Sequence, residues 1–154
     1  MLGRVHSWFQ KQFQNLIDMR FLMILVFFST TTAWSQDLET HQWKERVLIL
    51  KGGSEDYELV EKQFNQIRKF EKELLERKLV LYKCVAAKCT YYDFKEKPRF
   101  FKIEKPITIF SLELIGLDGG KKFESKTIEN AKTIFDLIDS MPMRRSEAKR
   151  TKND

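Results

Sequence analysis

The most restrictive feature of this sequence is a long amphipathic helix between two short apolar runs of strand length. Apolar residues recur at steps of three and four from Tyr57 to Leu74, which predicts a helix over about residues 55–76. The apolar runs at residues 46–50 and 79–82 have the length of strands. A strand–helix–strand unit makes its two strands parallel through a right-handed crossover, so the chain is predicted to belong to the α/β class.

The second half of the sequence predicts an antiparallel ending to this sheet. Residues 107–115 are rich in β-branched and apolar side chains, and an Asp-Gly-Gly turn separates them from a short return strand at 121–124. Thr127 is the expected cap of a last helix that Met141-Pro142 stops. We assign no strand or helix to residues 84–106. The predicted order is strand, helix, strand, irregular segment, strand, strand, helix, in a mixed sheet with flanking helices.

The first 35 residues have the character of an export signal. Residues 21–28 (FLMILVFF) are a short apolar core after Met19-Arg20, and small residues precede an expected cleavage after Ser35. Because Met19-Arg20 already completes such a signal, the sequence favours Met19 as the true start. Two alternatives stay open: a buried helix, and an uncleaved membrane anchor over residues 21–34, which falls short of the roughly 20 apolar residues of a span.

Cleavage would leave a domain at residues 36–147 and a charged tail at 148–154, with the chain expected to be loose from Arg144 onward. The predicted compartment is periplasmic or secreted. The formal net charge of the chain is +6, and removing the first 35 residues lowers it. This charge is too weak to indicate nucleic-acid binding, and export makes such a role less favourable still.

Composition excludes several classes of protein. With 42% hydrophobic and 32% charged residues, the chain is neither globally disordered nor of low complexity. Two cysteines cannot form a four-cysteine zinc site, and His41 and His6 are too few for a histidine-rich metal centre. We therefore predict no metal and no cofactor. His41 could serve as a base, but an exposed or capping role is the interpretation we prefer.

Three sequence clusters carry a family resemblance: residues 41–48 (HQWKERVL), 114–121 (LIGLDGGK) and 138–144 (IDSMPMR). Over about residues 38–147 the chain resembles domain-of-unknown-function family 4174 (DUF4174). The resemblance implies a thioredoxin-like fold in a clade of exported proteins, found also as modules of extracellular-matrix proteins, without established chemistry. The matching residues, for which we expect a structural role before a functional one, are Trp43, Arg46, Asp118, Gly119, Asp139, Pro142 and Arg144.

The cysteine pattern argues against ordinary thioredoxin chemistry. A thioredoxin-type oxidoreductase keeps its thiols where the first strand meets the long helix, but residues 51–56 read Lys-Gly-Gly-Ser-Glu-Asp. A phosphate cradle at this junction is disfavoured, because the motif lacks the P-loop spacing and its acidic residues repel anions. Cys84 and Cys89 follow the second strand. We expect a local disulfide there; the alternative is a redox-active or peroxide-reactive pair.

The last candidate surface is the basic and aromatic stretch from Tyr82 to Lys105. Interleaved cations and rings can contact a protein, an acidic glycan or an anionic lipid surface, although the interpretation we prefer is that the rings belong to the core and the lysines are solvated. The residues proposed for this surface are Tyr91, Tyr92, Lys95, Lys97 and Arg99. Two hypotheses follow: a non-catalytic binding or structural module that contacts an unknown envelope or matrix component, and a thiol oxidoreductase or peroxidase that uses Cys84 and Cys89.

Overall fold

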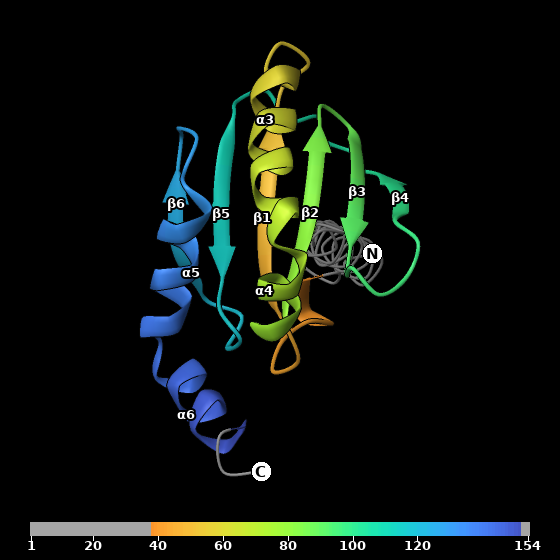
Figure 1. Ribbon diagram of the computed structural model, residues 1–154. Helices are drawn as coiled ribbons and strands as arrows, with labels where there is room; N and C mark the ends of the chain where they lie inside the picture. The colour runs from red at the N-terminus through yellow and green to blue at the C-terminus, as the bar shows by residue number, and fades with distance from the viewer. Residues whose placement is uncertain (1–37, 152–154) are drawn as a thin grey trace, which may run out of the picture. The chain divides into compact units, whose positions relative to one another are not determined.

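The computed structural model describes residues 38–151, and these form a mixed α/β domain (Figure 1). The described strands are β1 (Arg46–Gly52), β2 (Leu79–Val85), β3 (Lys88–Tyr92), β4 (Arg99–Lys102), β5 (Ser111–Ile115) and β6 (Lys121–Ser125). They lie in one sheet in the order β4-β3-β2-β1-β5-β6. β1 and β2 are parallel, as the strand–helix–strand pattern predicts, and the other neighbouring pairs are antiparallel.

The long amphipathic helix is present but interrupted. It consists of α3 (Tyr57–Ile67), the 3-10 turn η1 (Arg68–Phe70) and α4 (Glu71–Glu76). Val60, Phe64, Ile67 and Leu74 are buried, so the apolar periodicity finds the face that packs on the sheet. Phe70 lies in the interruption, where the helical phase shifts, and it is 40% exposed.

The segment without a sequence assignment holds two strands, β3 and β4, and this is a correction to the predicted order. β3 pairs with β2 through a tight hairpin, and β4 pairs with β3 at the outer edge of the sheet. The strand expected at 107–115 is also shorter than predicted, because only Ser111–Ile115 is paired.

The hydrophobic core lies on the face of the sheet that α3 and α5 (Ala131–Ser140) cover (Figure 1). Alternate residues of the central strands point toward it, including Leu48 and Leu50 of β1 and Leu112 and Leu114 of β5. The α5 helix begins later than expected: Asn130, not Thr127, is its cap, and the Asn130 side chain accepts a hydrogen bond from the Lys132 N–H (2.9 Å).

Residues 142–151 are helical, whereas we expected the chain to be loose from Arg144 onward. α5 ends at Ser140, as the Met141-Pro142 stop predicts, but Pro142 then begins α6 (Pro142–Thr151). Proline suits the first position of a helix, because its missing N–H would have no partner there. The predicted signal, the alternative anchor at residues 21–34 and the alternative start at Met19 lie outside the described residues. Among residues 38–151, no helix is long and apolar enough to cross a membrane.

Candidate functional site

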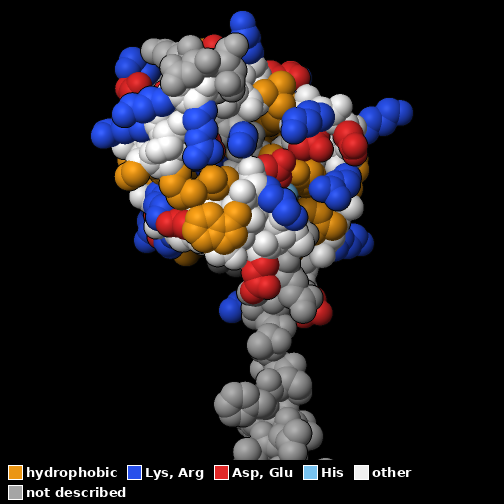
Figure 2. Space-filling model, turned by 90° about the horizontal axis from the view of Figure 1, so that it is seen from below, with side chains coloured by type: hydrophobic (Ala, Val, Ile, Leu, Met, Phe, Trp, Pro, Cys, Tyr) orange, Lys and Arg blue, Asp and Glu red, His pale blue; other side chains and the backbone are white. Residues whose placement is uncertain are grey.

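The residues that carry the family resemblance gather at one end of the sheet. β1 begins there with Arg46, and the β5–β6 turn and the α5–α6 junction lie at the same end, low in Figure 1. The junction of β1 and α3, where a thioredoxin would hold its thiols, is at the opposite end. Viewed from below, this end presents Lys and Arg side chains interspersed with hydrophobic and acidic ones (Figure 2).

A buried arginine network joins the start of β1 to the C-terminal helices. Arg46 is fully buried, and its Nη1 donates to the Arg77 carbonyl (2.8 Å) and to Glu147 Oε2 (3.1 Å). Arg144 donates from Nη1 to the Glu76 carbonyl (3.0 Å). These bonds fasten α6 to β1 and α4, and they explain why the chain beyond Pro142 is ordered.

Asp139 connects the same network to α5. Its carboxylate accepts hydrogen bonds from Arg77 Nη2 (2.6 Å) and Arg144 Nε (3.2 Å). Partial burial acts to raise the pKa of Asp139, but the two guanidinium groups outweigh it and hold the pKa below its ordinary value. Of the seven resemblance residues, three therefore lie in this network, Arg46, Asp139 and Arg144, and Pro142 begins the helix that carries Arg144.

Trp43, Asp118 and Gly119 belong to a second unit made of two touching turns. Trp43 donates its N–H to the Leu117 carbonyl (2.7 Å), and Gln42 Nε2 donates to the Asp118 carbonyl (3.0 Å). Gly119 has a φ of +79°, and a Cβ there would lie 3.3 Å from Gln42 Nε2. A side chain at position 119 is thus opposed both by backbone conformation and by the neighbouring turn.

Trp43 itself is held in a strained and exposed position. Its φ is +65°, a conformation that costs a bulky residue on the order of 1–3 kcal/mol, and its side chain is 64% exposed. Lys122 Nζ holds the facing turn together through Asp118 Oδ2 (2.6 Å). That hydrogen bond, followed by one from the Gly120 N–H, lowers the pKa of Asp118.

His41 is buried, and the expectation of an exposed or capping histidine is wrong. One ring nitrogen lies 2.8 Å from Glu45 Oε2, and the other lies 2.7 Å from the Tyr82 hydroxyl. The ring also stacks on Tyr91, with centroids 5.5 Å apart. The Tyr82 hydroxyl lies 41 residues further along the chain, on β2, and Tyr91 lies on β3, so no local sequence signal could have shown this burial.

The proposed basic and aromatic surface divides into buried rings and exposed cations. Tyr91 is buried, and Tyr92 packs against Phe64 of α3 with ring centroids 4.7 Å apart. Burial, followed by the charges of Glu45 and Asp93, raises the pKa of Tyr91 to about 12. Lys95 and Lys97 are exposed, and the Arg99 guanidinium lies over the Tyr91 ring at 4.4 Å.

The exposed aromatic ring of this region belongs to Phe100, which was not among the residues proposed from the sequence. Phe100 of β4 is 80% exposed. Its neighbours Arg99 and Phe101 point to the other face of the strand, where Phe101 meets Tyr82 edge-on. Recognising β4 as an edge strand would have identified Phe100, but no strand was assigned to this segment from the sequence.

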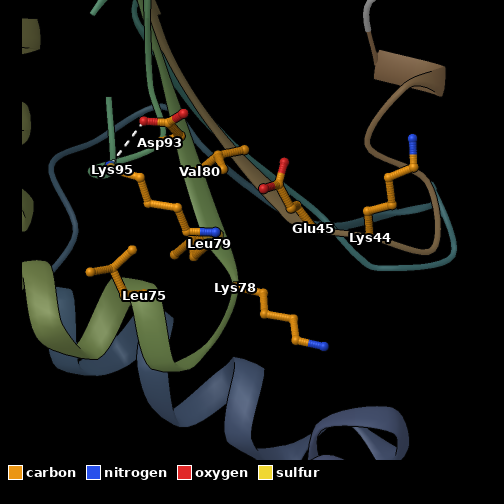
Figure 3. Close-up of a pocket in the computed structure, with 8 residues that line it drawn as sticks. All are labelled: Lys44, Glu45, Leu75, Lys78, Leu79, Val80, Asp93 and Lys95. Atoms are coloured by element: carbon orange, nitrogen blue, oxygen red, sulfur yellow. Dashed lines mark hydrogen bonds between the residues drawn. The ribbon is translucent and has the colours of Figure 1, made fainter. Parts of the chain in front are cut away.

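A small pocket opens where β3 turns away from β2 (Figure 3). Leu81 and Tyr92 form the last β2–β3 pair, so the start of β2 has a neighbour only in β1. The volume of the pocket is about 230 Å³, below the range of roughly 300–1,000 Å³ typical of drug-sized ligand sites. It is lined by Lys44, Glu45, Leu75, Lys78, Leu79, Val80, Asp93 and Lys95.

The two carboxylates of this pocket already have partners. Glu45 contacts His41, and Asp93 Oδ1 accepts hydrogen bonds from the N–H groups of Lys95 (3.0 Å) and Glu96 (2.9 Å). The hydrogen bond from the Glu96 N–H is the main cause that lowers the pKa of Asp93. The pocket is a notch with Lys44, Lys78 and Lys95 at its rim and apolar side chains at its floor, smaller than a site for a drug-sized ligand.

The β1–α3 junction carries no chemistry of the thioredoxin or phosphate-binding kind. Asp56 Oδ2 accepts the Gly53 N–H (3.0 Å), so the acidic side chain takes the donor that an anion would need. A Cβ on Gly53 would lie 2.9 Å from the Thr108 carbonyl oxygen, so glycine there allows two backbone segments to approach closely. The junction is a strand-to-helix turn, as the sequence analysis preferred.

Cys84 and Cys89 form the expected local disulfide. They are directly opposite each other on β2 and β3, with Cα atoms 4.1 Å apart, the close spacing of a pair that shares no backbone hydrogen bonds. The two side chains are 0% and 1% exposed. Among residues 38–151, no group of three or more His, Cys, Asp or Glu side chains could hold a metal ion.

Fold and site define an α/β protein with a mixed six-stranded sheet, a buried hairpin disulfide and, where β1 and β2 begin, an end that presents Lys44, Lys78 and Lys95 and is called the basic end below. The described residues contain no recognisable catalytic constellation. The chain belongs to the family described as "Domain of unknown function (DUF4174)", whose model matches residues 37–147. This confirms the family resemblance. No curated protein and no solved structure matches the chain.

Proposed function

We propose that this chain is exported and acts outside the cytoplasm as a non-catalytic binding module with a thioredoxin-like fold. Its partner would be an envelope or matrix component. The signal-like first 35 residues support export, and so does the disulfide, since such bonds persist in oxidising compartments. The mixed sheet, with its parallel β1–β2 pair and antiparallel ending, is compatible with a thioredoxin-like arrangement.

The observation that best supports a non-catalytic role is the burial of both cysteine side chains. A redox-active cysteine is partly exposed and lies in an electropositive setting that favours the thiolate. Cys84 and Cys89 are instead enclosed within the β2–β3 hairpin. The junction of β1 and α3 is the place where a helix N-terminus could lower a thiol pKa, but the chain has Gly52, Gly53 and Ser54 there and no cysteine.

The basic end of the sheet and the adjoining β4 edge are the surfaces we assign to binding. They present exposed lysines beside exposed rings, with Trp43 and Phe100 as the most exposed aromatic side chains among the described residues. Aromatic and cationic side chains at a surface are typical of recognition sites for acidic partners.

The paired substitution Cys84→Ser and Cys89→Ser separates this function from the alternative, a thiol oxidoreductase or peroxidase. A binding module should keep its affinity for its ligand and lose at most a few kcal/mol of stability. An enzyme that uses these thiols should lose all disulfide-reducing and peroxide-consuming activity. Measurable turnover by the wild-type chain that disappears in the double variant would contradict the proposal.

A further inference from the structure

We propose that the free edge of β4 binds an extended acidic peptide segment, which pairs with β4 as an added strand. This inference rests on the proposed binding function and names the chemistry of its partner. β4 is the outermost strand on one side of the sheet, beside β3 and with no further described strand beyond it (Figure 1). An exposed edge of this kind is a template for strand addition.

The register of β4 shows which backbone groups face outward. Ile103 donates its N–H to the Ala87 carbonyl (3.0 Å), and hydrogen-bonded pairs alternate along an antiparallel ladder. Arg99 and Phe101 therefore direct their backbone groups toward β3. Phe100 and Lys102 direct theirs away from the sheet, where an added strand would find both donors and acceptors.

The side chains of β4 are not those of a protected edge. Edge strands are commonly shielded by charges or prolines, and large apolar groups are avoided there. Lys102 and the preceding Pro98 fit that pattern, but Phe100, at 80% exposure, does not. A ring so exposed beside free backbone groups favours a surface that is covered in use.

Charge indicates an acidic occupant. Lys95, Lys97 and Lys102 form no ion pair with any described residue. The opposite edge strand, β6, differs, because Lys121 is paired with Glu124 (2.6 Å) and Lys122 with Asp118 (2.6 Å). The cations of the β6 edge are thus neutralised within the domain, and those of the β4 side are available to a partner.

A second copy of this chain suits the edge poorly. Pairing two β4 edges would bring Lys95, Lys97 and Lys102 of one copy, which have no ion-pair partner among the described residues, beside the same cations of the other. Like charges brought together across a strand pair oppose its formation. The best partner has carboxylates opposite Arg99 and Lys102 and apolar residues opposite Phe100 and Phe101, which is an acidic–apolar–apolar–acidic sequence.

The probe is the peptide acetyl-Thr-Thr-Glu-Val-Val-Glu-Thr-Thr-amide, titrated into the full chain. One control peptide replaces both Glu by Lys. A second keeps all side chains but carries N-methyl groups on the two residues that face Phe100 and Lys102, which removes the backbone donors. We expect binding of the probe only, weakened by added salt.

Protein variants separate the backbone contribution from charge. Lys102→Thr and Lys102→Pro remove the same charge, but only proline also removes the outward N–H, and proline is tolerated where a strand N–H faces solvent. We expect Lys102→Pro to bind about tenfold more weakly than Lys102→Thr, the effect of one lost hydrogen bond. Lys121→Thr on β6 is the matched control and should bind as the wild type does. Thermal unfolding verifies that each variant is folded.

Several results would overturn the inference. Equal affinity for Lys102→Pro and Lys102→Thr, or undiminished binding of the N-methylated peptide, would mean that charge alone acts. A dimer in sedimentation that Lys102→Pro dissociates would assign the edge to a second copy. If heparin or phosphatidylglycerol vesicles bind and the acidic peptide does not, strand addition is refuted, but the proposed binding function is not. Thiol turnover that requires Cys84 and Cys89 would instead refute the proposed function.

Discussion

Arg46 and Glu147 are 101 residues apart in the sequence, yet Arg46 Nη1 donates a hydrogen bond to Glu147 Oε2 at 3.1 Å. The pair joins the first residue of β1 to the middle of α6. The arginine is fully buried, and its Nε and Nη2 atoms have no hydrogen-bond partner among the described residues. The contact therefore fixes the position of α6 at the cost of burying an incompletely satisfied guanidinium.

Removing Glu147 should lower the stability of the domain more than removing Arg46. Glu147→Ala leaves a buried, uncompensated arginine and should lower the free energy of unfolding by about 3 kcal/mol. Arg46→Met removes the buried charge together with its unpartnered atoms, so its cost should be smaller. Chemical denaturation of both variants checks this order. A larger loss of unfolding free energy in Arg46→Met than in Glu147→Ala would contradict this, because it would show that the hydrogen bonds of the guanidinium stabilise the domain more than its burial destabilises it.

Asp139 should make the free energy of unfolding depend on pH in the acidic range. Because its pKa in the folded chain lies below the ordinary value of 3.8, its contribution is fully present above that pH. It is lost as the pH falls through the lower, folded-state pKa. The difference in unfolding free energy between the wild type and Asp139→Asn should therefore shrink below about pH 4. A difference that stays constant down to pH 2 would contradict the assignment.

Tyr91 should make the stability of the domain depend on pH in the alkaline range. Its folded-state pKa of about 12 exceeds the ordinary value of 10.0, so its contribution to stability is present below pH 10 and is lost as the pH rises through 12. Near-ultraviolet titration of the four tyrosines should reveal one that ionises near 12, and Tyr91→Phe should remove that transition. Persistence of the transition in the variant would assign it to another ring.

Gly119 and Trp43, which both have a left-handed backbone conformation, should respond differently to substitution. Gly119→Ala introduces a Cβ at a φ of +79°, close to Gln42, and should lower stability by about 1–2 kcal/mol. Trp43→Gly relieves a strained backbone and removes a largely exposed side chain, so it should change stability by under about 1 kcal/mol. Thermal unfolding of the two variants measures both effects. A large loss in Trp43→Gly would show that the indole packs on the domain.

The elements that sequence analysis found are those with strong local patterns. The helical periodicity from Tyr57 to Leu74, the apolar run at residues 46–50 and the Asp-Gly-Gly turn all correspond to observed structure. The β2–β3 hairpin was missed because its turn is formed by Ala86 and Ala87, with Ala86 at a φ of +50°. No glycine or asparagine marks that turn, so the usual hairpin signal is absent.

Other features depend on contacts between distant residues and leave no local pattern. Half of the residues of α6 are charged, and it has no apolar stripe to indicate a helix that packs on the domain; its position comes from Arg144 and Glu147. His41 is buried only because Tyr82 and Tyr91 lie over it. The disulfide was predicted correctly, since the expectation of export and the close spacing of the two cysteines together suffice to suggest it.

The reduction potential of the Cys84–Cys89 bond tests the central claim most directly. It is measured by equilibrating the protein with glutathione buffers and counting free thiols by intact mass. A structural disulfide, as the binding-module proposal requires, should have a potential below about −300 mV. A potential near −200 mV, or thiols that peroxide consumes, would contradict the proposal and make this a redox protein with an unusual site.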